Sequence, residues 1–521
     1  MTLNRNGIIQ ELETSHEPWD IIIIGGGATG VGVAIDAASR GYRTLLVERY
    51  DFGKGTSSRS TKLIHGGVRY LQQGNISLVL EALRERGLLR QNAPHLVHDL
   101  PFVVPRYDWW EGGFYGFGLK VYDIMAGRQG FGRSRLLSLE KTVQHIPTIE
   151  TKGLRGGVIY FDGQFDDARL VINMVQTAAE QGATLANYVE VRGLVKSSGV
   201  ITGIQAIDLE TGKEIQASGK VVINATGPFA DSIRRLDDPS VKPLIAPSQG
   251  VHIVLDRSFL PGDSAIMVPH TDDGRVMFAI PWYDSVIVGT TDTPIHDVIV
   301  EPRPFPEEID YLLGHAARYL SKDPTPSDIR SAFAGIRPLV GSEDVESTAA
   351  LSRDHVVHIS QTGLITIAGG KWTTYRKMAQ DVVDQAALLG DLEVRECVTS
   401  NLPIHGYHRN PERFGHLKTY GSDAPAIQAL IRERPDYAER LHPEMPYLVG
   451  EVVWSVRHEM ARTVEDVLSR RTRALLLGAR TSVEMAPRVA QIMASELGKD
   501  QSWVESQVAQ YTNLARLYIV E

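Results

Sequence analysis

The sequence predicts an α/β protein in which a Rossmann-like unit is joined to a mixed and largely antiparallel sheet, followed by a helical C-terminal domain. Three observations predict this fold. A β-branched run near the start ends in closely spaced glycines. Short strand-like segments separated by Asp, Gly and Pro crowd between residues 251 and 290, and helix-favouring runs fill the chain after residue 400. The 521 residues suffice for about two or three domains.

Composition excludes several classes of partner. The net charge of −9 lacks the basic footprint that a phosphate backbone requires, so we expect no nucleic acid. The single cysteine, Cys397, cannot form an internal disulfide, which favours a reducing, cytoplasmic compartment. No Cys/His cluster has metal-site spacing, so no metal ion is expected.

Residues 1–18 are expected to form a loose N-terminal tail. They contain Glu11, Glu13 and Glu17 and no apolar run, which argues against a secretory or transit peptide. The first apolar run, residues 21–24, is far shorter than the ~20 residues that a membrane-spanning helix needs. Any membrane association should therefore be peripheral.

A βαβ unit follows this tail. Trp19 to Ile24 is a short β-branched run, residues 27–41 form an alanine-rich stretch with a glycine stop, and Arg43 to Glu48 indicates a second strand. Such a unit implies parallel strands joined by a right-handed crossover.

Further strands are predicted in a large mixed sheet system. They lie at residues 157–161, 189–194, 200–209 and 221–224. The segments VHIVL, SAIMV, RVMFAIPW and SVIVGTT, between residues 251 and 291, are typical of antiparallel strands in a substrate-binding layer that covers a cofactor. We expect an oxidoreductase region over 19–395, with interleaved cofactor and substrate parts, and the helical domain over 400–521.

Three glycines between the first strand and the first helix form a dinucleotide fingerprint. Gly25 permits a tight turn, Gly27 lets the backbone approach a pyrophosphate, and Gly30 allows close packing of helix on strand. The helix N-terminus stabilises the anion. Glu48, which follows Gly30 by 18 residues, is placed to accept a ribose hydroxyl, and this favours FAD or NAD over NADP.

Later segments favour FAD over NAD. Residues 56–67 are dense in hydroxyl and small side chains, which suits a second cofactor-lining segment, and residues 224–227 and 368–374 are strand ends where backbone N–H groups meet a ligand. The residues predicted to contact the cofactor are Gly25, Gly27, Ala28, Thr29, Gly30, Glu48, Thr56, Ser57, Ser58, Lys62, Ile64, His65, Ala225, Thr226, Gly227, Gly370, Lys371, Trp372 and Thr373.

Six motifs resemble those of one family. They are IGGGATGVGVAIDAASRG (24–41), TSSRSTKLIHGGVRYL (56–71), DDARL (166–170), NATGPFADS (224–232), AGIRPL (334–339) and AGGKWTTYRKMA (368–379). The sequence is similar to the FAD-dependent glycerol-3-phosphate dehydrogenases, within the D-amino-acid-oxidase-like flavoproteins. RHEMARTVEDVLSRRTR (457–473) is similar to that family's helical C-terminal domain.

The resemblance implies a reaction and a set of partners. It implies FAD as cofactor, oxidation of sn-glycerol 3-phosphate to dihydroxyacetone phosphate in glycerol catabolism, and a quinone as electron acceptor. It also implies peripheral attachment to the inner face of the cell membrane and is compatible with a homodimer.

The resemblance further implies the substrate pocket. Arg337 is expected to bind the substrate anion, because a guanidinium fork matches phosphate oxygens. Arg69, Tyr70, Arg353 and Lys371 align with other pocket residues, and several cations suit a dianionic phosphate. Lys371 has a second interpretation, in which it stabilises negative charge on the reduced flavin. The alternative for Arg337 and Lys371 is an ordinary salt bridge.

His252 and His65 are the candidates for the general base that takes the hydroxyl proton. For each, the alternative is a hydrogen-bonded structural histidine. Two other functions compete with the dehydrogenase: a glycerol-3-phosphate oxidase that releases hydrogen peroxide, and a non-catalytic flavin electron carrier. An amine or amino-acid oxidase is disfavoured by the several cations of the expected pocket.

Residues 109–139 are expected to contact the membrane surface. Phe114, Phe117, Val121 and Ile124 recur at helical spacing, although Gly112, Gly113, Gly116 and Gly118 weaken a helix there. The expected interfacial rings are Trp109, Trp110, Tyr115 and Tyr122. Lys120, Arg128, Arg133 and Arg135 oppose only Asp123, so residues 112–139 carry a net charge of +3. The alternative is packing in the core or in a dimer interface.

Overall fold

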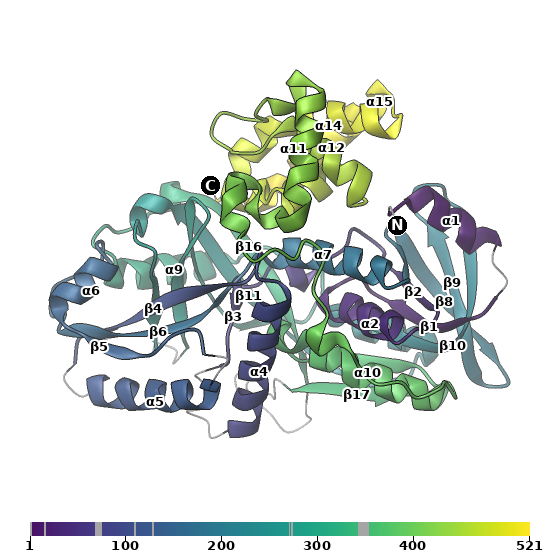
Figure 1. The fold of residues 1–521 in the computed structure, drawn as a ribbon, viewed down its shortest axis with the longest axis horizontal. Coiled ribbons are helices and arrows are strands. Elements are labelled where there is room, and N and C mark those ends of the chain that lie inside the picture. Colours follow the sequence, from purple (N-terminus) through teal and green to yellow (C-terminus); the bar gives the residue numbers. More distant parts are fainter. Residues whose placement is uncertain are drawn as a thin grey trace.

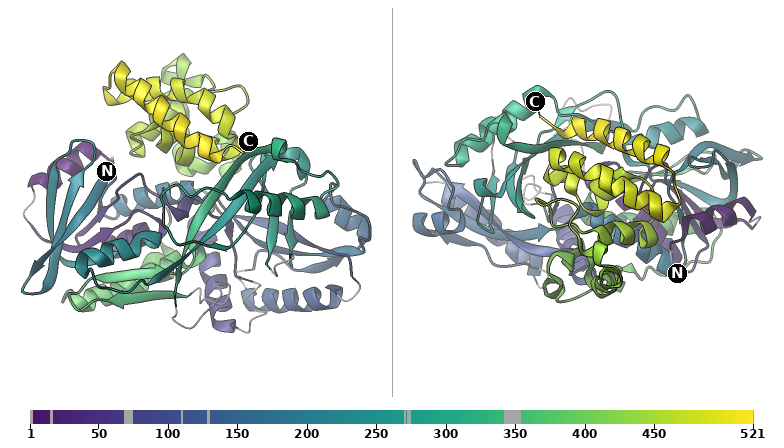
Figure 2. Two further views of the ribbon diagram at one scale, coloured as in Figure 1. Left: turned by 180° about the vertical axis from the view of Figure 1, so that it is seen from behind. Right: turned by 90° about the horizontal axis from the view of Figure 1, so that it is seen from above.

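The computed structural model describes residues 3–14, 17–67, 75–108, 111–127, 130–269, 271, 275–341 and 354–520, with side chains of 111–117 left out. Two sheets lie side by side, and a helical region sits above their junction (Figures 1 and 2). The expected α/β fold with a helical C-terminal region is therefore confirmed.

The first sheet is built on parallel strands. These strands are buried and rich in β-branched residues, as is typical of parallel strands, which helices cover. Its main path within the described residues is β17 (His355–Ile359), β18 (Ile365–Gly369), β10 (Glu214–Asn224), β1 (Trp19–Ile24), β2 (Thr44–Val47) and β7 (Thr184–Ala186). The antiparallel hairpin of β8 (Val189–Ser197) and β9 (Val200–Asp208) extends from β10.

Helices α2 (Ala28–Ser39), α7 (Asp167–Glu180) and α10 (Tyr375–Leu389) share one buried core with this sheet. β1, α2 and β2 form the predicted βαβ unit with parallel strands, so this prediction is confirmed. The short helix α8 (Ala230–Asp237) follows β10 and packs near β18.

The second sheet is mostly antiparallel. Its main path is β15 (Thr293–Pro294), β11 (Ile245–Asp256), β14 (Ser285–Gly289), β13 (Met277–Trp282), β12 (Ala265–Val268), β4 (His98–Arg106), β6 (Gly156–Gln164) and β3 (Leu63–Ile64). β16 (Ile329–Val340) pairs with β11, and β5 (Arg135–Leu137) pairs with β6. The predicted antiparallel segments between 251 and 291 are these strands β11 to β14. Helices α6 (Leu139–His145) and α9 (Pro306–Tyr319) flank the sheet.

The C-terminal region is helical as predicted, but its core is not separate. Its α-helices are α11 (Ala424–Glu433), α12 (Val449–His458), α13 (Ala474–Leu477), α14 (Ala479–Leu497) and α15 (Gln501–Ala515), with a π-helical turn at Asp466–Arg471. One apolar cluster joins these helices to Val254, Trp282, Ile287 and Phe333 of the second sheet. The region is thus packed directly onto the sheet that was expected to hold the substrate.

The prediction of a loose N-terminal tail was wrong. Residues Arg5–Thr14 form helix α1, whose Ile9 and Leu12 are buried in the core on the far side of the first sheet. Arg5 is also buried, and it pairs with Asp208 and donates to the carbonyl of Asn187 at 3.1 Å. These partners lie about 200 residues along the chain, so local sequence gave no sign of them.

The segment expected to contact a membrane forms α5 (Glu111–Ala126) in spite of its glycines, next to α4 (Ile76–Asn92). Tyr122 was wrongly assigned to an interface: it is 1% exposed, donates to Asp162 and accepts the Gly66 N–H. Ile124, by contrast, is 78% exposed. Trp109, Trp110 and Arg128 lie outside the described residues, as do the side chains of Phe114, Tyr115 and Phe117.

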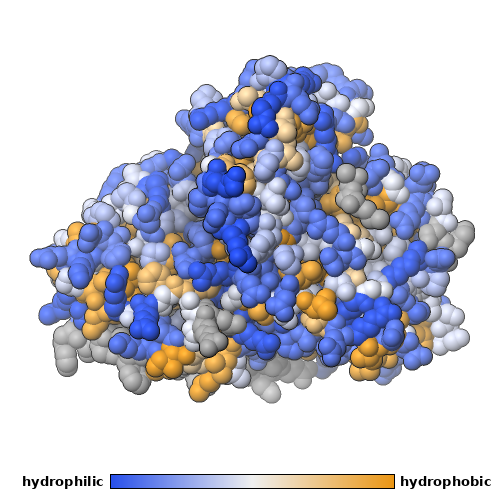
Figure 3. All heavy atoms as spheres, viewed as in Figure 1, coloured by the Kyte–Doolittle hydropathy of each residue, from blue (hydrophilic) through white to orange (hydrophobic). Residues whose placement is uncertain are grey.

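Apolar atoms gather at the lower edge of the face in Figure 3, where Figure 1 places α4 and α5. Within the described ranges, none of the helices combines the length and the apolar character needed to cross a membrane.

The chain that enters the C-terminal region is held on α7 through His405. Its Nδ1 lies 2.6 Å from Glu180 of α7, and its Nε2 lies 2.8 Å from Asp423, just before α11. Burial alone lowers the pKa of His405, but the carboxylates of Asp423 and Glu180 outweigh burial and raise it from 6.5 to about 9. His405 is therefore charged at neutral pH and bridges two carboxylates.

We predict a pH-dependent contribution of His405 to stability. Because its folded pKa is raised, the contribution is fully present below pH 6.5 and is lost as the pH rises through about 9. It amounts to at most about 3 kcal/mol. In His405→Gln the melting temperature should fall most at pH 6, and the gap from wild type should narrow toward pH 9. A gap that stays constant from pH 6 to pH 9.5 would contradict this account.

Candidate functional site

A cavity of about 520 Å³ opens at the carboxyl ends of the parallel strands β1, β2, β10 and β18. Ligands of open parallel sheets bind at this edge. The predicted cofactor contacts that line it are Gly25, Gly27, Ala28, Thr29, Glu48, Thr56, Ser57, Ala225, Thr226, Gly227, Gly370, Lys371 and Trp372. Segments predicted separately from the sequence are thus brought together around one space.

The three fingerprint glycines are required for three different reasons. Gly25 has φ +112°, a conformation that side chains disfavour. A Cβ on Gly30 would lie 1.9 Å from the Gly25 carbonyl oxygen, so only glycine permits this approach of helix and strand. A Cβ on Gly27 would meet only Ser57 Oγ, at 3.0 Å, and Gly27 faces the cavity. The fold needs Gly25 and Gly30, whereas Gly27 keeps space for a ligand.

Glu48 lies at the end of β2, as a ribose-binding acid should. One carboxylate oxygen accepts the Gly26 N–H at 2.6 Å, and the other accepts the Tyr50 N–H at 2.8 Å. Burial raises the pKa of Glu48, although the two N–H donors oppose this effect. Each oxygen keeps a further lone pair with which to accept a hydroxyl.

A second cavity, of about 180 Å³, lies at the second sheet and is lined by residues of β3, β4, β6, β12, β13 and β16. Its polar lining includes Thr61, His65, Asp162, Arg275, Thr290, Asp292 and Arg337. Arg337 lines this cavity, whereas the next residue of β16, Pro338, lines the larger one. Because successive strand residues point to opposite faces, β16 borders both spaces.

Arg337 is oriented by several acceptors. Its Nη1 lies 3.0 Å from Asp292 Oδ1, and its Nη2 donates to Thr290 Oγ1 at 3.1 Å and to the Thr291 carbonyl at 2.9 Å. Its side chain is 22% exposed, so the guanidinium still reaches the cavity. Sequence reasoning missed Asp292, for which the available signal was an acid three residues after a buried strand, in SVIVGTTD.

The two candidate bases occupy different positions. His65 lines the smaller cavity. His252 is 3% exposed and lies behind the cavity wall, where its Nε2 is 3.0 Å from Thr61 Oγ1 and its ring stacks on Phe333. Burial lowers the pKa of His252 well below 6.5, and the cations of Lys62 and Arg337 lower it further. His252 is thus a neutral imidazole that contacts the cavity through Thr61.

Several predicted site residues lie elsewhere. The side chain of Lys62 was wrongly assigned to the cofactor, because it is fully buried and its Nζ donates to Asp167 at 2.7 Å. Ile64 is a core residue with no exposed surface. The other predicted contacts that the larger cavity's lining leaves out are Gly30, Ser58, His65 and Thr373. Arg69, Tyr70 and Arg353 lie outside the described residues.

Comparison with known proteins gives two family matches. A family model described as FAD dependent oxidoreductase matches residues 20–376. A second model, described as the C-terminal domain of alpha-glycerophosphate oxidase, matches residues 360–504.

Individual relatives match over nearly the whole chain. The mitochondrial glycerol-3-phosphate dehydrogenase of Mus musculus is 42% identical over 95% of this chain and 72% of its own length. The corresponding protein of Arabidopsis thaliana is 42% identical over 94% of this chain and 84% of its own. A solved glycerol-3-phosphate dehydrogenase from Bacillus halodurans complexed with FAD is 30% identical and covers 99% of this chain and 98% of its own, with a TM-score of 0.81.

We predict that Gly27→Val and Gly30→Ala fail in different ways. Gly27→Val should fold but lose FAD, because its side chain fills the space where a pyrophosphate approaches. Gly30→Ala should destabilise the protein itself, since its Cβ meets backbone. Flavin absorbance per protein and the melting temperature of the flavin-free proteins check both outcomes. A folded Gly27→Val that keeps FAD at native affinity would rule out this use of the fingerprint.

Proposed function

Because the chain belongs to the family of FAD-dependent oxidoreductases that includes the glycerol-3-phosphate dehydrogenases, we propose that it oxidises sn-glycerol 3-phosphate to dihydroxyacetone phosphate. FAD is the resident cofactor, a quinone receives the electrons, and the reaction serves glycerol catabolism. One observation supports this most: a guanidinium, Arg337, faces a small cavity next to the cofactor cavity, and β16 borders both spaces.

The larger cavity suits FAD. Its volume of about 520 Å³ lies within the range of about 300–1,000 Å³ that is usual for such ligands. The Gly27 turn with the N-terminus of α2 would hold the pyrophosphate, and Glu48 would hold the ribose. The segment of Gly370 to Trp372 would lie against the ring system, where Lys371 would stabilise negative charge. When bound, FAD supplies the acceptor for the hydride that leaves the secondary alcohol carbon.

The smaller cavity selects the phosphate. Arg337 would pair with phosphate oxygens through its planar fork, and Asp292 would keep the guanidinium in orientation by its 3.0 Å contact. Arg275 lines the same space and would add a second positive charge. Arg69, Tyr70 and Arg353 stay predicted members of this pocket.

The hydroxyl proton has two candidate acceptors. His65 lines the cavity and would take the proton directly. His252 would take it through Thr61, whose Oγ1 is 3.0 Å from the His252 Nε2. In the protein without substrate, burial lowers the pKa of His252, and the cations of Lys62 and Arg337 lower it further. A phosphate dianion bound to Arg337 would counteract the effect of the Arg337 charge on this pKa. We favour His252 as the base because substrate binding itself would increase its basicity.

Arg337→Ala should lower kcat/KM for glycerol 3-phosphate, and the fall should correspond to a loss of ~2–5 kcal/mol of transition-state stabilisation. FAD content should stay near native. Arg330→Ala is the matched control, because Arg330 lies on the same strand but pairs at the surface with Asp256. Glycerol should be a poor substrate of the native enzyme. Equal kcat/KM values for glycerol and glycerol 3-phosphate would refute phosphate recognition as the basis of this site.

Electron delivery is proposed to take place at the inner face of the cell membrane, through the surface formed by α4, α5, β5 and the start of α6. Exposed apolar side chains there are Ile76, Leu80, Ile124, Leu136 and Leu139. Lys120, Arg133 and Arg135 are exposed beside them. Anionic headgroups attract such cations by about 1 kcal/mol each. A homodimer interface is the competing use of this surface.

Native protein should sediment with anionic liposomes at low salt and be released by high salt. Ile124→Glu should weaken sedimentation while turnover with a small soluble dye persists. Leu388→Glu, on the 74% exposed side chain of α10, is the matched control and should bind like the native protein. Native protein that stays in the supernatant, or that elutes as a dimer dissociated by Ile124→Glu, would argue against membrane contact.

A glycerol-3-phosphate oxidase is the second candidate, since the family model that matches residues 360–504 is described as the C-terminal domain of alpha-glycerophosphate oxidase. The dehydrogenase proposal predicts that steady-state turnover with a quinone analogue far exceeds peroxide release in air. Peroxide formed in equal amount to the product, with no stimulation by quinone, would favour the oxidase. A non-catalytic carrier would give turnover with neither acceptor.

A further inference from the structure

We propose that Arg473, Asp167 and Lys62 form a positioning unit through which the C-terminal helical region holds the Thr61–His252 contact at the substrate cavity. This proposal rests on the proposed function for the role of His252. It makes the C-terminal region a support of the reaction site in addition to a packing partner of the sheet.

Arg473 brings the C-terminal region to the first part of the chain. It follows the π-helical turn Asp466–Arg471, has φ +62° and is 1% exposed. Its Nη2 donates to Asp167 Oδ1 at 2.9 Å and to the Ser58 carbonyl at 2.9 Å. A buried guanidinium thus contacts both the start of α7 and the segment 56–61, whose residues line both cavities.

Asp167 transmits this contact to residues 58–62. Its Oδ2 accepts the Ser60 N–H at 3.0 Å, the Ser60 hydroxyl at 2.7 Å and Lys62 Nζ at 2.7 Å. Burial alone raises the pKa of Asp167, but Lys62 and Arg473 outweigh it and lower this pKa, so the carboxylate is charged. The residues on either side of Thr61 are therefore both fixed to Asp167.

Lys62 supports His252 from the other side. Its Nζ lies 5.0 Å from the centre of the Phe333 ring, and that ring stacks on His252 at 4.8 Å and 13°. Phe333 and His252 are also cross-strand partners on β16 and β11. The imidazole is thus held by Thr61 at one edge and by Phe333 on one face, and the positioning unit adjoins both.

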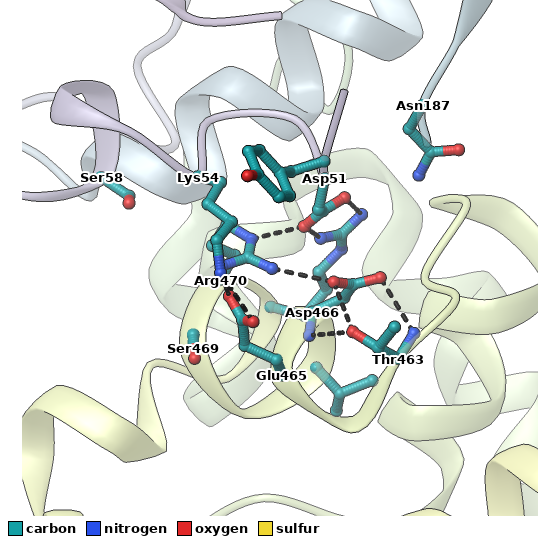
Figure 4. A network of polar contacts seen from close by, with 12 residues as sticks. Asp51, Lys54, Ser58, Asn187, Thr463, Glu465, Asp466, Ser469 and Arg470 are labelled. Atoms are coloured by element: carbon teal, nitrogen blue, oxygen red, sulfur yellow. Dashed lines mark hydrogen bonds and ion pairs between the residues drawn. The ribbon is translucent and has the colours of Figure 1, made fainter. Parts of the chain in front are cut away.

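A neighbouring ion cluster should keep the region docked when Arg473 is changed. Arg470 pairs with Asp51, Glu465 and Asp466 (Figure 4), and Arg471 Nη2 donates to Asp51 at 3.0 Å. Removing Arg473 also leaves the Asp167–Lys62 pair intact. Removing Asp167 would instead leave the buried Lys62 without its ion-pair partner and Arg473 with its longer, 3.6 Å contact to Asp166. Arg473→Met is therefore the variant expected to fold.

The test measures kcat and KM per bound FAD with glycerol 3-phosphate and a soluble dye. Arg473→Met should retain FAD and lose at least about tenfold in kcat, since small misplacements of a reacting group are costly. KM should stay within about threefold, because Arg337 is untouched. Arg473→Lys should recover part of kcat. Arg457→Met is the matched control, because Arg457 pairs with Glu496 at the surface of the same region.

A second variant and a second readout keep the outcome decisive. Lys62→Met should show the same loss of kcat, and it replaces Arg473→Met if that variant does not fold. Nitrogen-15 histidine spectra, with His252 assigned through His252→Gln, should show changed His252 signals in both variants even without substrate. Native kcat and unchanged His252 signals in a destabilised Arg473→Met would overturn the proposal. If wild type fails to oxidise glycerol 3-phosphate, the proposed function fails, and the spectra still test the positioning unit.

Discussion

The structure depends on the pairing of charges that are buried where the C-terminal region meets the cofactor segment. Asp51, Arg470 and Arg471 are almost inaccessible to water, and Arg471 reaches Asp51 from 420 residues along the chain. Removing an ion from water costs several kcal/mol unless a partner and hydrogen bonds replace the solvent. A partly docked C-terminal region would leave such charges unpaired, so we expect this region and the segment of residues 49–62 to become ordered together (Figure 4).

The same segment serves both cavities. Thr56 and Ser57 line the larger one, and Thr61 lines the smaller one. β16 borders both spaces, with Pro338 facing one and Arg337 the other. A short segment and one strand thus determine how a cofactor and a phosphorylated alcohol lie relative to each other. Contacts that fix this segment therefore affect the reaction as well as the stability of the fold. Buried side chains of the C-terminal region make such contacts, and in this way they influence the reaction site.

Local features could be predicted from the sequence, because the physical reason for each lies within a few residues. The glycine fingerprint is one: Gly25 needs a positive φ, and Gly30 needs the absence of a Cβ. The antiparallel strands of residues 251–291 are another, since turn residues separate short apolar runs. Arg337 was placed from its motif, and the structure puts it in a cavity next to the cofactor space.

The predictions that were wrong concern residues whose partners lie far away in the sequence. The hydroxyl-rich run suggested that Lys62 faces the cofactor, but its positive φ accompanies a side chain buried against Asp167. Tyr122 was predicted to lie at an interface because the segment around it is rich in aromatic residues. Its hydroxyl instead donates to Asp162 and accepts the Gly66 N–H in the interior. Asp292 was overlooked because an acid after a strand becomes significant only when Arg337 is seen beside it.

The most direct measurement for the central claim is an anaerobic titration of the purified flavoprotein with glycerol 3-phosphate, in which the absorbance of the oxidised flavin is monitored. The account predicts full bleaching by a small excess of glycerol 3-phosphate, no bleaching by the same concentration of glycerol, and recovery of absorbance when a quinone is added. A flavin that stays oxidised with glycerol 3-phosphate, or that is bleached equally by glycerol, would contradict it.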